Sequence, residues 1–203
     1  MTVDELFKLS NLKEYKQIKW GTKFYDEKSG VYIVSLSDNP LMNSNLQVSP
    51  LINNVALSKW IRNAPQMSVD NQVATRDLLE ERLTKFWLAH ENILYIGKAG
   101  LRVNRKGISN RIMEYFRTEI GKSTPHAGGQ WLKVLDNIDD LYVYYAYTDV
   151  PCEIEKEMLS NFMRNVREQD LACLFDSDLP LPFANLEYPH GKRKKHGLKK
   201  QRK

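Results

Sequence analysis

The sequence has little cysteine and no long apolar run. Its 203 residues contain two cysteines, Cys152 and Cys173, and neither stands at zinc-ligand spacing with any of the four histidines. A single pair of cysteines cannot form a disulfide scaffold. No apolar run approaches the roughly 18 residues that cross a bilayer, and the first residues lack the basic start and apolar block of a signal peptide. We therefore expect a protein of the reducing cytoplasm that does not bind a membrane.

The positive charge of the chain is concentrated in two stretches. The formal net charge is +5. Residues 192–203 hold eight Lys or Arg and no acid, which leaves 22 basic against 25 acidic side chains, a net −3, in the rest of the chain. Residues 98–122 carry seven basic residues against two acidic ones. Such clustering is typical of a protein that contacts a phosphate backbone, although a basic tail alone can equally serve solubility.

Residues 93–121 show the clearest local pattern. The apolar run from Ile93 to Gly97 predicts a buried strand. A basic loop follows, and apolar residues then recur every three to four positions from residue 109 to 120, which predicts an amphipathic helix. Arg111 and Tyr115 are four residues apart, so they are neighbours on one face of that helix.

The remaining sequence predicts a small α+β layer. β-branched and aromatic residues predict strands at 31–36 and 141–148, and an apolar stripe predicts a helix at 153–169. Between the first two strands we expect helices at 51–61 and from about 68 to 91. Three strands with helices segregated around them form a single small domain.

The chain divides into three parts by composition. Residues 1–29 are expected to form an N-terminal arm that contains a short amphipathic helix near residues 6–15. Residues 30–190 form the domain, with an insertion at 37–92. Residues 191–203 form a basic tail that we expect to be disordered in isolation.

Two tripeptides, Gly30-Val31-Tyr32 and Tyr95-Ile96-Gly97, fall on predicted strands. A basic helix with an arginine, a further strand, a helix rich in glutamate and a later asparagine follow them. Taken together, this pattern resembles the GIY-YIG nuclease family. The run from Tyr95 to Ala99, followed by Arg111 to Phe116, is similar to the nuclease module of bacterial excision-repair enzymes. The resemblance covers about residues 29–36 and 93–187.

The resemblance implies a fold and a set of functional residues. The implied GIY-YIG nuclease fold is a small three-stranded antiparallel sheet flanked by helices, here with a helical insertion between the first two strands. Six residues would be catalytic: Tyr32, Tyr95, Lys98, Arg111, Tyr115 and Glu155. Four further residues would bind the substrate: Arg102, Arg105, His126 and Asn185.

The chain departs from the family pattern in three places. The two tripeptides are separated by 62 residues, far more than is usual in the family, so residues 37–92 would be an insertion. The spacing of the family arginine points to Arg105, but Arg105 lacks an aromatic residue four positions on, so we match Arg111 and keep Arg105 and Arg102 as second choices. Asn185 lies farther from the glutamate than the family asparagine does.

The implied chemistry is phosphodiester hydrolysis. Tyr32 would be the general base, and because a free tyrosine has a pKa near ~10, its pKa would have to fall by roughly 3 units to act near neutrality. Lys98 and Arg111 could lower it if they lie close, since a nearby cation favours the phenolate. Arg111 would also stabilise the charge of the transition state. Tyr95 would orient the phosphate or the water, and Tyr115 would assist proton handling.

The family uses one divalent metal held by a single carboxylate. One carboxylate suits Mg²⁺ (or Mn²⁺), which keeps most of its waters and takes substrate phosphate oxygens as further ligands. The spacing of the apolar residues that follow favours Glu155 as the ligand, with Glu153 and Glu157 as alternatives.

These features predict a Mg²⁺-dependent DNA endonuclease of the type II restriction class, with a homodimer on a palindromic site as one mode of binding. The first alternative is a catalytically inactive nucleic-acid-binding module that keeps the fold. The second is a nicking, repair or mobile-element endonuclease. The sequence does not specify the bases that would be recognised.

Overall fold

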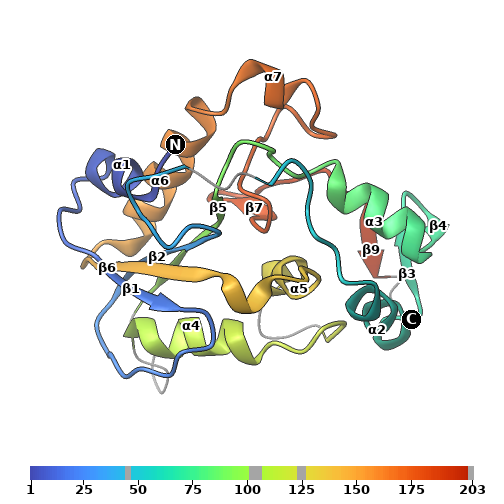
Figure 1. Ribbon diagram of the computed structural model, residues 1–203, viewed down its shortest axis with the longest axis horizontal. Coiled ribbons are helices and arrows are strands. Elements are labelled where there is room, and N and C mark those ends of the chain that lie inside the picture. Colours follow the sequence, from blue (N-terminus) through green and yellow to red (C-terminus); the bar gives the residue numbers. More distant parts are fainter. Residues whose placement is uncertain (44–46, 101–106, 123–126, 201–203) are drawn as a thin grey trace.

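Four antiparallel strands form the central sheet, in the order β1-β6-β2-β5 (Figure 1). The computed structural model describes residues 1–43, 47–100, 107–122 and 127–200. The strands of the central sheet are β1 (Lys16–Lys19), β2 (Gly30–Ser35), β5 (Ile93–Ala99) and β6 (Tyr142–Tyr147). The protein is therefore a mixed α/β protein with antiparallel sheets. The positions predicted for β2, β5 and β6 are confirmed, whereas the expected number of three strands is too small by one, because β1 adds to the edge beside β6.

The strand β2 lies at the centre of the packing. All six of its residues are buried, and it pairs with β5 on one side and with β6 on the other. A Cβ atom at Gly30 would overlap the carbonyl oxygen of Ala146 on β6. The close approach of these two strands therefore requires glycine at this position.

Helices cover both faces of the sheet. The face that carries Val31 packs against α6 (Pro151–Arg164) and α1 (Val3–Leu9). The opposite face, which carries Tyr32, packs against α4 (Gly107–Arg117). Figure 1 shows α4 and α6 on opposite sides of the strands. Each helix turns an apolar stripe toward the sheet, as predicted: α4 buries Ile108, Ile112 and Tyr115, and α6 buries Met158, Leu159 and Phe162.

The segment between β2 and β5 is only partly helical. It contains α2 (Asn54–Asn63), β3 (Met67–Val69), β4 (Gln72–Val73) and α3 (Arg76–Thr84). The prediction of one helix from about 68 to 91 is therefore wrong at both ends, since α3 begins at Arg76 and ends at Thr84. Asp70 and Asn71 connect β3 to β4 with φ angles of 48° and 69°, a left-handed turn that Asp and Asn tolerate better than most residues. The helix α3 begins after this turn, where the Thr75 side chain caps its N-terminus.

The C-terminal segment is folded against the rest of the chain as far as it is described. Its elements are α7 (Glu168–Leu171), β7 (Glu187–Tyr188), β8 (Lys192–Arg193) and β9 (Leu198–Lys200). The strand β8 pairs with β7, and β9 pairs with β3 of the insertion, beside which it lies in Figure 1. Lys194 is only 3% exposed. The expectation of a separate basic tail at 191–203 is therefore wrong for residues 191–200, because strand pairing and burial hold them in place.

The N-terminal residues also belong to the main body of the molecule. The helix α1 has a capping box at Thr2 and Glu5 and packs on α6. The strand β1 follows in the stretch that was expected to be an arm at 1–29. Two further short elements are α5 (Ala127–Lys133) and a 3-10 turn, η1 (Ile138–Asp140). Within the described ranges, no helix combines the length and the apolar character needed to cross a membrane.

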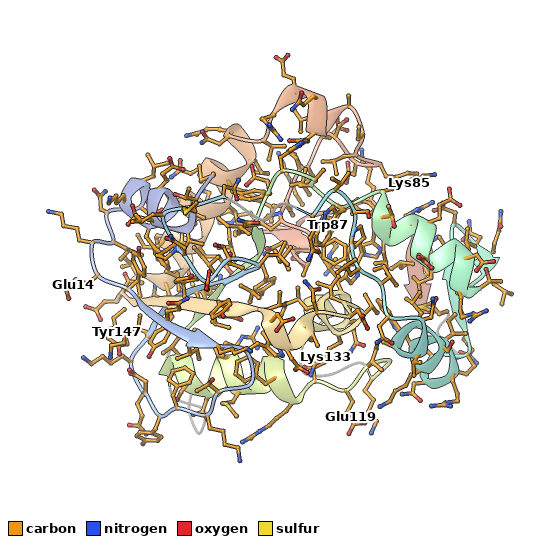
Figure 2. The ribbon with its side chains drawn as sticks, viewed as in Figure 1. Glu14, Lys85, Trp87, Glu119, Lys133 and Tyr147 are labelled. Atoms are coloured by element: carbon orange, nitrogen blue, oxygen red, sulfur yellow. The ribbon has the colours of Figure 1, made fainter. Side chains whose placement is uncertain are left out.

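Aromatic residues join the insertion, α5 and the C-terminal segment in one core. The ring centroids of Trp87 and Phe183 are 5.1 Å apart, those of Trp131 and Phe183 are 5.2 Å apart, and those of Phe86 and Trp131 are 5.5 Å apart. Figure 2 shows Trp87 inside the molecule, whereas Glu14 lies at its margin. The insertion therefore shares its core with the segments that hold the edge of β5.

Candidate active site

Gly97 makes room for two tyrosine rings on one face of the sheet. In the β2–β5 register Tyr32 lies opposite Gly97, and Tyr95 lies two residues before Gly97 on the same strand. A Cβ atom at Gly97 would stand 2.5 Å from Cε1 of Tyr95 and 2.8 Å from Cζ of Tyr32. Because no side chain occupies this position, both rings can lie over the glycine.

Three tyrosines form a buried cluster at this point. The ring centroids of Tyr95 and Tyr115 are 4.9 Å apart, those of Tyr32 and Tyr95 are 5.7 Å apart, and those of Tyr32 and Tyr115 are 6.4 Å apart. The helix α4 supplies Tyr115, and β2 and β5 supply the other two. The predicted spatial proximity of these three residues is therefore present in the structure.

Burial keeps these phenols protonated at neutral pH. It raises the pKa of Tyr32 to about 12, although the nearby charge of Arg111 acts to lower it. Burial also raises the pKa of Tyr95 and Tyr115 well above their usual value. The expectation that Lys98 and Arg111 bring the pKa of Tyr32 toward neutrality is therefore wrong for the free protein, since burial outweighs the effect of Arg111.

The Tyr32 hydroxyl is enclosed by protein. It is buried, and within the described part of the chain no polar atom lies at ordinary hydrogen-bonding distance and angle from it. Tyr95, by contrast, reaches the wall of a cavity. A water molecule in that cavity would therefore meet Tyr95 first, and contact with Tyr32 requires a movement of side chains.

Lys98 and Glu155 form an ion pair that connects β5 to α6. Their Nζ and Oε2 atoms are 2.7 Å apart. Burial raises the pKa of Glu155 above its usual value, even though the hydrogen bond and charge of Lys98 act in the opposite direction. Glu153 and Glu157, the alternatives to Glu155, are exposed on the same helix and do not line the cavity. Among the three glutamates, Glu155 alone faces the other predicted residues.

Arg111 points from α4 toward the same region. Its Nη1 atom donates a hydrogen bond of 3.0 Å to Oε2 of Glu114, one turn along the helix. Arg111 lines the same cavity as Tyr95 and Glu155. Its charge acts to lower the pKa values of Tyr32, Tyr95 and Glu155.

A cavity of about 340 Å³ lies at the junction of these elements. Five predicted residues line it: Tyr95, Lys98, Arg111, Glu155 and Asn185. Sequence reasoning did not select its other lining residues, which are Gly128, Ala184, Leu186, Glu187 and Pro189. The only signal for them was the Gly128-Gly129 pair. Three predicted substrate-binding residues, Arg102, Arg105 and His126, lie outside the described residues.

Asn185 holds the edge of β5. Its Nδ2 atom donates to the carbonyl oxygen of Ile96 at 2.7 Å, and its Oδ1 atom accepts from the N–H of Ile96 at 2.8 Å. The neighbouring N–H of Ala184 donates to the carbonyl oxygen of Leu94. Ala184 and Asn185 thus hydrogen-bond to the main chain of Leu94 and Ile96 as a neighbouring strand would. Both ends of the Asn185 amide therefore already serve a structural role. Substrate binding by Asn185 stays a prediction.

A larger groove lies at the far end of α4 and contains none of the predicted residues. Its volume is about 740 Å³. Its charged lining residues have mixed signs and include Glu119 and Lys133, both labelled in Figure 2. The Nζ of Lys133 is already bonded to the carbonyl oxygen of Phe116 at 2.7 Å. The smaller cavity is therefore the better candidate for chemistry, because it combines a buried carboxylate, cations and a tyrosine.

The side chains of the smaller cavity could hold a metal ion only through few protein ligands. Among the described residues, no three or more His, Cys, Asp or Glu side chains come together as metal ligands. Two carboxylates line the cavity: Glu155 is mostly buried, whereas Glu187 is half exposed and forms an ion pair with Arg193. Such a site suits a hard cation that keeps most of its water molecules, and it does not suit a metal that needs several protein ligands.

Comparison of the chain with protein-family models, curated proteins and solved structures found no match.

Proposed function

We propose that the protein is a divalent-metal-dependent DNA endonuclease of the GIY-YIG type, similar to type II restriction enzymes. The observation that carries the proposal is the convergence of Tyr95, Arg111 and the Lys98–Glu155 pair on one cavity from three different elements. A buried carboxylate, two cations and a phenol at one cavity are the groups that phosphodiester hydrolysis needs.

The arrangement of the sheet supports the same proposal. The strands β2, β5 and β6 would be the three strands of the family fold, with β1 as an addition and residues 37–92 as an insertion. In support, β2 lies between β5 and β6, and α4 and α6 cover opposite faces. The first tripeptide then lies on β2 and the second on β5, side by side in the register.

Each residue has a role in the proposed reaction. Arg111 and Lys98 bind the oxygens of the scissile phosphate and stabilise the charge that develops there. Tyr95 orients the phosphate from the cavity wall. Glu155 would hold Mg²⁺, which would supply positive charge for the phosphate and lower the pKa of a bound water. Tyr32 would accept the proton of the attacking water only as a phenolate and only after a side-chain movement. Because burial raises its pKa to about 12, the phenol must first lose its proton to solvent, which needs additional positive charge in the complex.

A second candidate function is nucleic-acid binding without catalysis. Two observations favour it: the Tyr32 hydroxyl is buried with its pKa raised to about 12, and Glu155 is already neutralised by Lys98. The two candidates make opposite predictions for strand cleavage and the same prediction for binding.

The test is a plasmid cleavage assay with a matched arginine control. Supercoiled DNA of mixed sequence is incubated with the protein, with and without Mg²⁺, alongside Arg111→Ala and Arg117→Ala. Arg117 is an exposed arginine of the same helix that lies outside the smaller cavity. The endonuclease proposal expects Mg²⁺-dependent cleavage that Arg111→Ala abolishes and Arg117→Ala retains. Binding of DNA without cleavage under any of these conditions would favour the inactive module.

A further inference from the structure

The Lys98–Glu155 pair occupies the position in which the proposed reaction needs a metal ion. The Lys98 side chain is 37% exposed, whereas that of Glu155 is only 13% exposed. Within the described residues, the Lys98 ammonium is the sole ion-pair partner of this carboxylate. A carboxylate buried to this extent is costly to leave without a counter-charge, so Lys98 stabilises it in the resting protein.

We infer that Lys98 acts as an internal cation that must leave Glu155 before a divalent metal can bind, and that it then binds the scissile phosphate. This inference rests on the proposed function and concerns the regulation of the same site. It makes Lys98 a residue with two successive partners: the carboxylate in the free protein and the phosphate in the substrate complex.

The two cations exclude each other on electrostatic and geometric grounds. A Mg²⁺ ion lies about 2.0–2.1 Å from a carboxylate oxygen, whereas the Lys98 ammonium already lies 2.7 Å from Oε2 of Glu155. An ammonium and a divalent ion within a few ångströms of each other repel strongly in a partly buried site. By linkage, a contact that strengthens the lysine–carboxylate pair must weaken metal binding by the same factor.

The position of Lys98 allows it to move from one partner to the other. It follows Gly97 on β5 and lines the cavity together with Arg111. A lysine side chain has a flexible four-carbon stem, and the exposure of Lys98 leaves room for a change of rotamer. Arg111 keeps its own helical partner, Glu114. Lys98 is thus the cation whose release depends on what binds Glu155.

The first test measures Mn²⁺ binding by electron paramagnetic resonance in the absence of DNA. Lys98→Met should bind Mn²⁺ about tenfold more tightly than the original protein, a change of ~1.4 kcal/mol. Lys98→Arg should bind it more weakly, because a guanidinium can hold the carboxylate with two hydrogen bonds. Lys156→Met removes an exposed lysine one position from Glu155 and should change the affinity by less than about twofold, since exposed charges are screened.

The second test follows the release of Lys98 through DNA binding in the presence of EDTA. Glu155→Gln frees the ammonium and should tighten binding of mixed-sequence duplex DNA, measured by fluorescence anisotropy. Removal of a negative charge would itself tighten binding, so the same substitution is repeated in the Lys98→Met protein. A larger gain with Lys98 present supports the inference, and an equal gain in both proteins overturns it.

The outcomes separate this inference from the proposed function. If Glu155→Gln loses Mn²⁺ while Lys98→Met binds no more tightly than the original protein, the exchange is overturned and the metal site stands. If Glu155→Gln binds Mn²⁺ as well as the original protein, the metal assignment itself fails, and the exchange fails with it. Far-ultraviolet circular dichroism of every variant shows whether the protein remains folded, and Lys98→Arg keeps the charge should Lys98→Met unfold.

Discussion

The ammonium of Lys194 lies inside the protein and donates a hydrogen bond of 2.9 Å to the carbonyl oxygen of Pro182. A second hydrogen bond, of 3.0 Å, runs to the carbonyl oxygen of Phe183. The next two residues along the chain, Ala184 and Asn185, pair with the edge of β5. Lys194 therefore fixes the segment that holds the strand carrying Tyr95, Gly97 and Lys98, and so connects the C-terminal residues to the candidate active site.

The burial of Lys194 predicts a dependence of stability on pH. Burial lowers its pKa to about 7, so the folded protein holds it neutral above that pH. In the unfolded chain a lysine stays protonated up to about pH 10.4. Between these values the unfolded chain binds more protons, and the free energy of unfolding should rise with pH. We expect Lys194→Met to remove about 2 kcal/mol of the increase between about pH 7.5 and 9.5, measured by urea unfolding.

The control for this prediction is an exposed lysine. Lys13→Met removes a lysine that is exposed and not buried on folding, so its pH profile should match that of the original protein. If the profile of Lys194→Met also matches, Lys194 stays charged in the folded state. The two carbonyl acceptors and the rings of Phe86 and Trp131, each 5.3 Å from the ammonium, would then be sufficient to hold a buried charge.

A methyl group at Gly97 should disrupt the tyrosine cluster. The Cβ atom of Gly97→Ala would meet the rings of Tyr32 and Tyr95 at 2.8 and 2.5 Å, so one ring must move. Overpacking of this kind costs about 1–3 kcal/mol. We expect that loss in the free energy of unfolding, together with a loss of plasmid cleavage. Gly100→Ala is the control, because a Cβ atom there meets no atom within 4 Å. Equal stability of the two variants would mean that the tyrosine rings can move aside at little cost in free energy.

The sequence predicts the central elements well because their patterns are local. Buried strands such as β2 and β5 are short runs of β-branched and aromatic residues, and α4 and α6 repeat apolar residues at helical spacing. The strand β1 was missed because three of its four residues are exposed and no apolar alternation marks it. It is defined by pairing with β6, which lies more than 120 residues later in the chain.

Long-range contacts explain the remaining errors. The segment with β3 and β4 was predicted to begin a helix because Val73 and the leucines after it fall at helical spacing. The strand β3 is defined instead by pairing with β9, which lies at the far end of the chain. Lys194 stands in a basic run that is normally exposed to solvent, and its burial depends on the carbonyl groups of Pro182 and Phe183. Neither feature has a local signal.

The sequence indicated which residues lie near one another better than it indicated their electrostatics. Tyr95, Lys98, Arg111 and Glu155 line one cavity, whereas Tyr32 and Tyr115 do not line it. The pKa of Tyr32 depends on how deeply the ring is buried, and no spacing in the sequence reports that depth. The pairing of Lys98 with Glu155 likewise depends on the position of α6 relative to β5.

Asn185 offers a test of how the edge of β5 is held. Asn185→Ala removes both hydrogen bonds to Ile96 and leaves a buried N–H and carbonyl oxygen without these partners. An unsatisfied buried polar group costs about 1–3 kcal/mol. We therefore expect a loss of at least ~2 kcal/mol and faster amide hydrogen exchange in residues 94–97. Asn54→Ala, at an exposed position on α2, should leave both measurements unchanged. Unchanged exchange in Asn185→Ala would show that the main-chain contact of Ala184 alone fixes the strand.

The exposed charges of β8 provide the test for DNA contact by the C-terminal segment. Deletion of this segment is unsuitable, because it would remove Lys194 and β9 together with the charge. Lys192 and Arg193 are exposed, and their hairpin partner β7 supplies Glu187 to the cavity wall. If both side chains bind phosphates, Lys192→Ser with Arg193→Ser should lower the slope of log affinity against log salt by about 1.8, since each contact contributes about 0.9.

Lys13→Ser with Lys23→Ser removes the same charge from exposed positions outside the cavity and should leave the slope unchanged. An equal decrease of the slope in both double variants would mean that DNA affinity depends on the net charge of the protein and not on contacts of this hairpin.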